Sequence, residues 1–362
     1  MLIKPIFFFL IIFSLAAQNA FAQTDFVSSF SGSIGQNTAT MHLVQVKGKL
    51  RAHLFYAPNG QAAYLTLSGS LKQNGNFFLQ EEMTSDTLIR GRMTANRMEG
   101  YLINTQNQLE RIALVATNLK GSIPLKPYSY SADHKLNTAL PGGPHALFES
   151  ELLLPEASTS NPLSDSILKL VFDVDTTVSP LQILEREATN FFDNYQKLNT
   201  FENTDTPSFQ WVKTCETGVL INEGGFLCIE SNTYGYTGGA HGLPNRLFTV
   251  LDTETGEQLH ITDLFTENAE NSLFLLLNDA IRKRYEIPAD SSLKSFGFFF
   301  DQIEPNTNYW LGSGGIGFYY NSYEIAPYSF GHTNIYIPFE SIEALMKEAV
   351  KQKLSQTQTF SN

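Results

Sequence analysis

Short runs of alternating apolar and polar residues fill the chain between residues 26 and 120. Examples are residues 51–56 and 63–67, and turn signals such as Gln73-Asn74-Gly75 separate successive runs. A period of two with Asn-Gly turns is typical of β-hairpins. Residues 23–120 are therefore predicted to form a β-rich domain, a meander, small barrel or sandwich. We expect it to act as a scaffold in preference to a binding site at its open end.

Apolar residues at helical spacing mark three segments further along the chain: 180–195, 269–285 and 341–354. The first has a strong start signal, because Ser179 can cap a helix and Pro180 suits the first helical position. Strands are predicted between the helices, at residues 168–174, 211–220, 226–232, 246–251 and 317–323. The predicted fold class is α+β: an N-terminal all-β, meander or barrel-like domain, then an α+β domain with helices packed on an antiparallel sheet.

A segment rich in proline, glycine and serine separates these two regions. It includes Pro141-Gly142-Gly143-Pro144 and has no hydrophobic period, so residues 121–145 are predicted to be a linker. Residues 346–362 are predicted to be a helix end and tail.

The first residues have the parts of an export signal. Lys4 precedes an apolar run over residues 5–17, and Ala20-Phe21-Ala22 gives a small-x-small cleavage pattern. A run of about 13 residues is shorter than the roughly 20 that a spanning helix needs, which disfavours an uncleaved anchor. Residues 1–22 are predicted to be a signal peptide. The protein is then exported, periplasmic or secreted, and has no membrane span after cleavage.

Composition narrows the range of partners. The formal net charge is −12, charged residues make up 17% of the chain and aromatic residues 12%. An acidic surface disfavours nucleic acid, whose phosphates require clusters of Lys and Arg, and favours cationic partners. The aromatic content suits β-rich exported proteins.

The two cysteines, Cys215 and Cys228, lie in one predicted hairpin around Asn222-Glu223-Gly224-Gly225. An even pair in an oxidising compartment favours a disulfide over two free thiols. Simple symmetric pairing about that turn, however, does not place the two cysteines opposite each other. Their spacing matches neither a zinc site nor a redox motif.

The search for catalytic chemistry is mostly negative. The sequence contains no Gly-x-Ser-x-Gly, no His-Glu-x-x-His and no phosphate-binding loop. Residues 312–317 match Gly-x-Gly-x-x-Gly, but they precede a predicted strand, which favours a turn over a dinucleotide site. The seven histidines show no metal-ligand spacing, so neither a metal nor a cofactor is predicted.

Two segments are candidate ligand-binding sites. In residues 236–242, three glycines surround His241, which indicates either a rigid loop that presents the imidazole or, as the favoured alternative, a structural turn. Residues 318–331 are rich in tyrosine and are either an exposed stacking platform or, again favoured, buried core. The candidate ligand-binding residues are Tyr236, Gly238, Gly239, His241, Tyr323, Glu324 and Tyr328.

These motifs carry a family resemblance. Residues 236–242, Phe248 to Gly256, Thr262-Asp263-Leu264-Phe265 and Tyr323-Glu324-Ile325-Ala326-Pro327-Tyr328 follow one known order. The pattern resembles the extracellular domain shared by the RsiV anti-sigma factor and the non-catalytic part of PdaC-type peptidoglycan deacetylases. It covers residues 145 to 345, as a PdaC-like subdomain (146–235) and an RsiV-like subdomain (236–345), and excludes the N-terminal β segment.

The resemblance implies an exported α+β domain of the bacterial envelope, and in the anti-sigma factor this domain binds lysozyme. The chain lacks a sigma-binding part and the deacetylase's catalytic motifs, so signalling and deacetylation do not carry over. The leading hypothesis is a non-catalytic binding module for a lysozyme-like protein or a peptidoglycan fragment. The alternatives are a hydrolase or deacetylase that uses His241 with Glu324 or Asp263, and a purely structural envelope protein.

Overall fold

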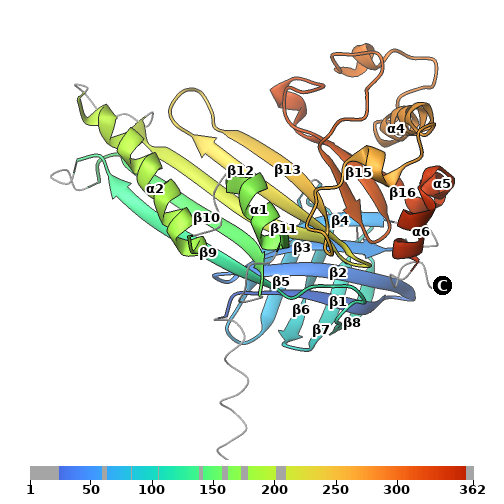
Figure 1. The fold of residues 1–362 in the computed structure, drawn as a ribbon, viewed down its shortest axis with the longest axis horizontal. Coiled ribbons are helices and arrows are strands. Elements are labelled where there is room, and N and C mark those ends of the chain that lie inside the picture. Colours follow the sequence, from blue (N-terminus) through green and yellow to red (C-terminus); the bar gives the residue numbers. More distant parts are fainter. Residues whose placement is uncertain are drawn as a thin grey trace, which may run out of the picture.

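The computed structural model describes residues 24–355, except 59–62, 83, 105, 138–141, 157–161, 173–177 and 201–208. The predicted signal peptide lies outside the described residues. The chain forms a closed barrel, a long five-stranded sheet and a three-stranded sheet (Figure 1). This architecture confirms the predicted fold class.

The barrel is a simple meander. Each strand pairs antiparallel with the next, and β8 returns to pair with β1, with Phe30 opposite Ala116. Its strands are β1 (Phe26–Ile34), β2 (Asn37–Val46), β3 (Lys49–Tyr56), β4 (Ala63–Leu71), β5 (Asn76–Glu81), β6 (Leu88–Thr94), β7 (Arg97–Ile103) and β8 (Leu109–Ala116).

Alternation along each barrel strand separates an apolar interior from an outer wall. On β2, Met41 and Leu43 belong to the apolar core of the barrel, whereas Val44 and Val46 pack into a different core, outside it. Side chains from the other strands fill the interior in the same way. The barrel interior is therefore filled by packed apolar side chains.

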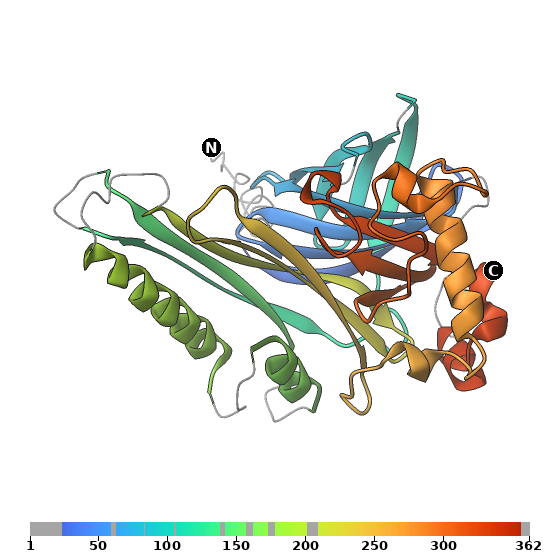
Figure 2. The ribbon, with the colours of Figure 1, turned by 90° about the horizontal axis from the view of Figure 1, so that it is seen from above.

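The long sheet has the strand order β13-β12-β11-β10-β9. Only β10 and β11 pair in parallel; the other neighbours are antiparallel. Figure 2 shows helices α1 and α2 on one side of this sheet and the barrel on the other. The elements are β9 (Leu125–Lys135), β10 (His145–Pro155), α1 (Pro162–Phe172), α2 (Pro180–Gln196), β11 (Trp211–Glu223), β12 (Phe226–Tyr236) and β13 (Leu243–Asp252).

Two predictions in this region were wrong. The predicted linker contains β9, which pairs along its whole length with β10; because β9 is an edge strand, it tolerates Pro127. The predicted strand at residues 168–174 is the end of helix α1, as far as that segment is described. The apolar run there read as a strand, but Leu163, Ile167 and Leu168 lie on one helical face that packs against the sheet.

Two of the three predicted helices are confirmed, and the third is interrupted. Ser179 caps α2 and forms a full capping box with Gln182, and α4 (Glu270–Arg284) occupies the second predicted segment. The third segment is broken into α5 (Phe339–Ile342), a 3-10 turn (Glu343–Leu345) and α6 (Glu348–Leu354). The break falls where Met346 forms an isolated β-bridge with Phe265 and is buried there.

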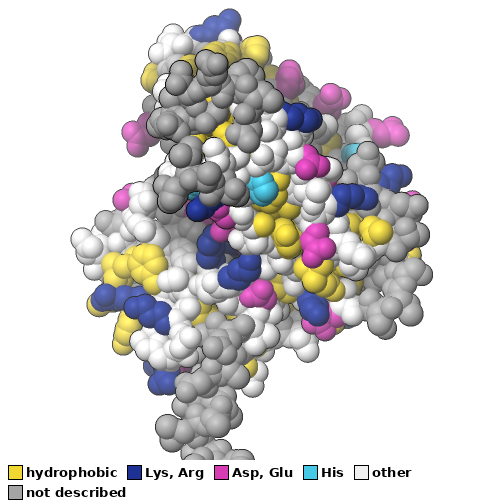
Figure 3. All heavy atoms as spheres, turned by 90° about the vertical axis from the view of Figure 1, so that its left-hand side faces the viewer, with side chains coloured by type: hydrophobic (Ala, Val, Ile, Leu, Met, Phe, Trp, Pro, Cys, Tyr) yellow, Lys and Arg dark blue, Asp and Glu magenta, His cyan; other side chains and the backbone are white. Residues whose placement is uncertain are grey.

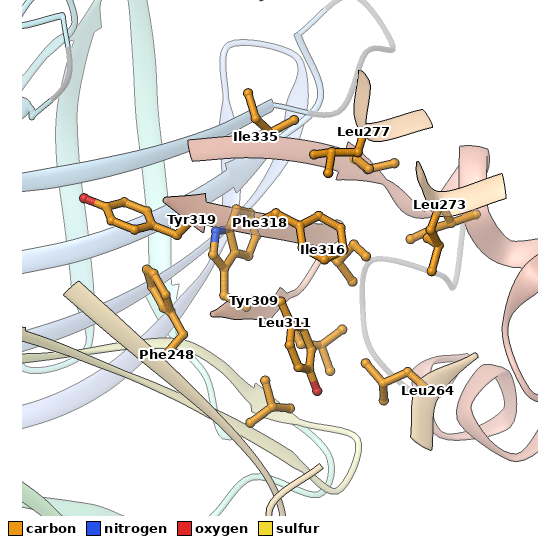
Figure 4. Close-up of a cluster of buried hydrophobic side chains, with 14 of the residues drawn as sticks. Phe248, Leu264, Leu273, Leu277, Tyr309, Leu311, Ile316, Phe318, Tyr319 and Ile335 are labelled. Carbon is orange, nitrogen blue, oxygen red and sulfur yellow. The ribbon is translucent and has the colours of Figure 1, made fainter. Parts of the chain in front are cut away.

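The C-terminal sheet packs between α4 and the barrel. It consists of β14 (Tyr309–Gly312), β15 (Gly315–Tyr320) and β16 (Thr333–Pro338), in the order β14-β15-β16. Figure 4 shows its apolar side chains gathered with those of α4, of the short helix α3 (Ile261–Leu264) and of β13. Phe55, on the outer wall of the barrel, belongs to the same core, so the barrel and the C-terminal region share one hydrophobic core.

The predicted disulfide is contradicted, since both cysteines are free and buried. Cys215 lies opposite Thr233 and Cys228 opposite Ile221, with a β-bulge between them at Val219/Ile221. Positions 228 and 233 of β12 are an odd number of residues apart, so the two thiols point to opposite faces of the sheet.

Candidate functional site

The glycine-rich segment at residues 236–242 connects β12 to β13. Gly238 and Gly239 both have φ near +100°, a backbone conformation that residues other than glycine rarely adopt. Nothing lies within 4 Å of a Cβ built on Gly239, so this glycine serves backbone geometry and not close packing. The Tyr236 hydroxyl donates to the Gly239 carbonyl at 3.0 Å and braces the loop.

This loop contacts the tyrosine-rich segment. The rings of His241 and Tyr328 stack with centroids 4.2 Å apart and planes 22° apart. Both side chains also donate to the carbonyl of Gly242, from His241 Nδ1 at 2.9 Å and from the Tyr328 hydroxyl at 3.4 Å. The structure thus brings together two segments that the sequence singled out separately.

The tyrosine-rich segment is held in place by hydrogen bonds to β13 and within itself. The side chain of Asn321 accepts from the backbone N–H of Arg246 at 2.7 Å and donates to its carbonyl at 3.1 Å. Glu324 accepts from the backbone N–H of Asn321 at 3.0 Å. Tyr323 has φ +73° and is 53% exposed, and its ring lies 5.6 Å from that of Tyr328.

Further exposed rings extend this region. Tyr234 is 39% exposed, and Gly242 packs so closely on its ring that a Cβ would lie 2.3 Å from it. The Phe299 backbone N–H donates to the Ile325 carbonyl at 2.8 Å, which places a phenylalanine-rich segment beside the tyrosines. We call the following residues the aromatic surface: Tyr234, Tyr236, His241, Phe296, Phe299, Phe300, Tyr323 and Tyr328.

Sequence analysis missed Tyr234 and the three phenylalanines. The run Phe298-Phe299-Phe300 was the available signal. Phe298 packs into the core, whereas Phe296, Phe299 and Phe300 are 42–51% exposed. In a strand that packs on one face, only every second side chain would be exposed. This segment is irregular, so the neighbouring rings of Phe299 and Phe300 are both exposed.

The acid–base pair of the hydrolase hypothesis is not formed among the described residues. Within the described part of the chain, the His241 ring hydrogen-bonds only to the Gly242 carbonyl. Glu324 is bound to Asn321, and Asp263 accepts from the backbone N–H of His260 at 2.8 Å. The described part of the chain also holds no group of three or more His, Cys, Asp or Glu side chains that suits a metal ion.

A buried polar network lies beneath the aromatic surface, at the junction with the barrel. His53 on β3 contacts Glu230 on β12 through Nε2 at 2.7 Å and Tyr64 through Nδ1 at 2.8 Å. Arg246 forms ion pairs with Glu230 and with Glu82 of the barrel, both at 2.8 Å. The network therefore joins the barrel to β13, whose Arg246 backbone positions Asn321.

The electrostatics of this network favour charged Glu230. Burial alone would raise the pKa of Glu230, but the positive charge of Arg246 and the contact with His53 outweigh burial and lower it to about 2. Further along β3, Arg51 pairs with buried Glu151, and exposed Lys49 with Glu149 and Glu216. The outer face of β3 presents basic groups to the glutamates of the long sheet, because every second side chain of a strand points to the same face. These groups are Lys49, Arg51 and His53.

Figure 3 shows the end of the molecule where β12 and β13 turn. On this face hydrophobic, basic and acidic side chains are interspersed, and neither charge gathers in one large area. No helix within the described residues is long and apolar enough to cross a membrane.

Two family models match consecutive parts of the chain, both after the barrel. Residues 144–244 match the model described as Deacetylase PdaC, and residues 262–340 match the model described as Protein of unknown function (DUF3298). The region after the barrel is thus similar to a PdaC segment followed by a DUF3298 segment, and we call it the C-terminal module. This confirms the resemblance predicted for residues 145 to 345. The aromatic surface draws on both matched segments, since Tyr234 to His241 lie in the first and Tyr323 and Tyr328 in the second.

One solved structure shows the same fold for much of the chain. A DUF3298 family member from Bacteroides fragilis is 24% identical, with a TM-score of 0.59; the match covers 66% of this chain and 100% of that one. A DUF3298 family protein from Pseudomonas aeruginosa is 21% identical, with a TM-score of 0.46, over 63% of this chain and 96% of that one. No curated protein matches.

Proposed function

We propose that this protein is an exported, non-catalytic binding protein of the bacterial envelope, and that its C-terminal module binds a basic protein of the lysozyme type. Export rests on the predicted signal peptide at residues 1–22. The choice of partner rests on the resemblance to the RsiV domain and on the net charge of −12. The barrel then serves as a scaffold for the module.

The observation that carries the proposal is the exposed aromatic surface. Tyrosine and other large aromatic side chains are enriched among the residues that dominate protein–protein binding energy. Soluble monomers rarely leave several large rings exposed side by side without a binding role. Glu324 is exposed and directly follows Tyr323 in the chain, so it supplies negative charge beside these rings, which complements a basic partner.

The test is calorimetric titration of the mature protein with hen-type lysozyme and with soluble peptidoglycan fragments, at low and at physiological salt. We expect saturable lysozyme binding that persists at physiological salt. The double variant His241→Ala/Tyr328→Ala and the single variant Tyr323→Ala should each weaken it at least about tenfold, the effect of losing roughly 1.4 kcal/mol. Tyr101→Ala, which removes a ring 51% exposed on the barrel, is the matched control.

Three outcomes would count against the proposal. Binding of peptidoglycan fragments alone would replace the protein partner with a glycan. Lysozyme binding that disappears at physiological salt would be non-specific attraction between opposite charges. Equal loss in the surface variants and in Tyr101→Ala would remove the aromatic surface as the site.

A further inference from the structure

A cavity of about 350 Å³ opens between the barrel and the C-terminal module, and none of the residues of the aromatic surface lines it. Its lining comes from β4, the end of β5 and the loop that follows it, α4 and β16; Figure 1 shows β4, β16 and α4 at the upper right of the molecule. Ligand pockets commonly have volumes of about 300–1,000 Å³ and commonly lie between domains. The side chains that matter for the argument are Tyr64, Thr66, Glu81, Arg284, Asn334 and Tyr336.

One side of this cavity is an ordered aromatic wall. The Tyr64 ring lies 4.3 Å from that of Trp310, which in turn stacks on Tyr336 at 5.7 Å with planes 5° apart. The Tyr64 hydroxyl accepts from Thr66 Oγ1 and hydrogen-bonds to His53 Nδ1, both at 2.8 Å. The Tyr336 hydroxyl donates to the Gly314 carbonyl at 2.8 Å. Both rings are thus fixed before any ligand arrives, which reduces the entropic cost of binding.

Polar groups surround this wall, and several are buried. Thr66, Glu81 and Thr87 line the cavity although they are only 6%, 7% and 8% exposed. Asn334 accepts from the Trp310 indole N–H at 2.9 Å through Oδ1, which leaves its amide N–H groups out of that bond. Polar side chains buried at a cavity are the usual means of orienting a bound ligand.

From these features we propose that the cavity is a binding site for a small neutral saccharide of one or two rings. The aromatic wall offers a flat apolar face for a sugar ring. The Asn334 amide, the Glu81 carboxylate and the Arg284 guanidinium supply donors and acceptors for sugar hydroxyls, each of which both donates and accepts. The Glu81 carboxylate is itself held in place, because one of its oxygens accepts from the backbone N–H of Thr84 at 2.6 Å. The single carboxylate of Glu81 and the single guanidinium of Arg284 balance in charge, which favours an uncharged ligand over an anion or a cation. The site does not depend on the proposed partner of the aromatic surface.

The chain contains only two tryptophans, Trp211 and Trp310, which makes the test specific. Glucose, N-acetylglucosamine and their β-1,4-linked disaccharides are titrated into the mature protein while the two indole N–H signals are followed by NMR. Binding in the cavity should shift the Trp310 signal, which is bonded to Asn334, and leave that of Trp211, in the distant part of the long sheet, unchanged. We expect at least one sugar to saturate with a Kd below about 10 mM.

Variants then tie the shift to the cavity. Glu81→Gln and Arg284→Gln should each weaken binding at least about fivefold, whereas Lys283→Gln, a neighbouring change outside the cavity lining, should not. Tyr323→Ala should also leave sugar binding intact, so failure here is distinguishable from failure of the aromatic surface. Absence of saturable binding by every sugar, or binding that leaves the Trp310 signal unmoved, overturns the proposal.

Discussion

Glu230 links His53 of the barrel to Arg246 of β13 in a buried network. It lies 2.7 Å from His53 of the barrel and 2.8 Å from Arg246 of β13, and it is 3% exposed. Glu230→Gln removes the more deeply buried of the two carboxylates that pair with Arg246 and leaves its pair with Glu82, and breaking a buried pair in this way is strongly destabilising. We expect the free energy of unfolding, measured by urea denaturation, to fall by about 3–5 kcal/mol.

The matched control is Glu99→Gln on the barrel surface. It breaks the pair with Arg97, in which the side chains are 61% and 49% exposed, and exposed pairs contribute about 0–1 kcal/mol. If both variants lost the same stability, the network around Glu230 would contribute no more than an ordinary surface pair.

His42 contributes to the pH dependence of stability in mildly acidic solution. Burial, with a smaller contribution from nearby His53, lowers its pKa from 6.5 to about 3. Between these values the unfolded chain binds a proton that the folded protein does not, so stability falls as the pH falls, by up to about 1.4 kcal/mol per pH unit. Glu230 adds to this loss only below its ordinary pKa of 4.5.

We therefore expect His42→Gln to flatten the dependence of unfolding free energy on pH between about 6.5 and 5. Glutamine keeps hydrogen-bonding groups for Ser29 and Ser313, which lie 2.8 and 3.2 Å from the two ring nitrogens. His145→Gln, at a side chain 44% exposed, should leave the dependence unchanged. An unaltered slope in His42→Gln would contradict the assignment.

At the scale of the element, the register of β11 with β12 keeps the two thiols apart. Burial raises the pKa of both Cys215 and Cys228, which further suppresses the reactive thiolate. We expect a thiol-reactive dye to label neither cysteine in the folded protein and both after unfolding in guanidinium without reductant. An unfolded sample treated with reductant should show two labelled cysteines per chain. Fewer labelled cysteines in the unfolded sample without reductant would reveal a disulfide.

The elements differ in how far the sequence could predict them, and the reason is the range of the interaction that decides each one. Ser179 and Gln182 cap α2 through bonds three residues apart, so the signal is local and the prediction succeeded. The break at Met346 depends on a bridge to Phe265, and β9 depends on pairing with β10. Neither partner is visible from within the segment, so both predictions failed.

The same distinction applies to the aromatic surface at the scale of the whole molecule. The glycines around His241 and the tyrosine cluster were visible in the sequence as two separate local patterns. The contact between them, the stacking of the His241 ring on the Tyr328 ring, joins residues 87 positions apart and was not visible. The outer face of β3 was read as ordinary alternation, because its glutamate partners lie about 100 to 180 residues further along the chain. Local patterns locate elements; the pairing of distant elements builds the sites.

The shared core and the buried network also predict how the whole molecule unfolds. Phe55 of the barrel packs in the core of the module, with its ring 6.3 Å from that of Trp310, so neither part is complete alone.

Both tryptophans lie in the module, so fluorescence reports its unfolding, whereas far-UV circular dichroism reports all strands, including those of the barrel. We expect the two signals to give one coincident urea transition, as two-state unfolding requires. Phe55→Ala, which weakens the shared core, should lower the midpoint, while Phe78→Ala, at a ring 41% exposed on the barrel, should change it little. Separate transitions in the unaltered protein would mean that the barrel and the module are independent units and that the junction stabilises neither.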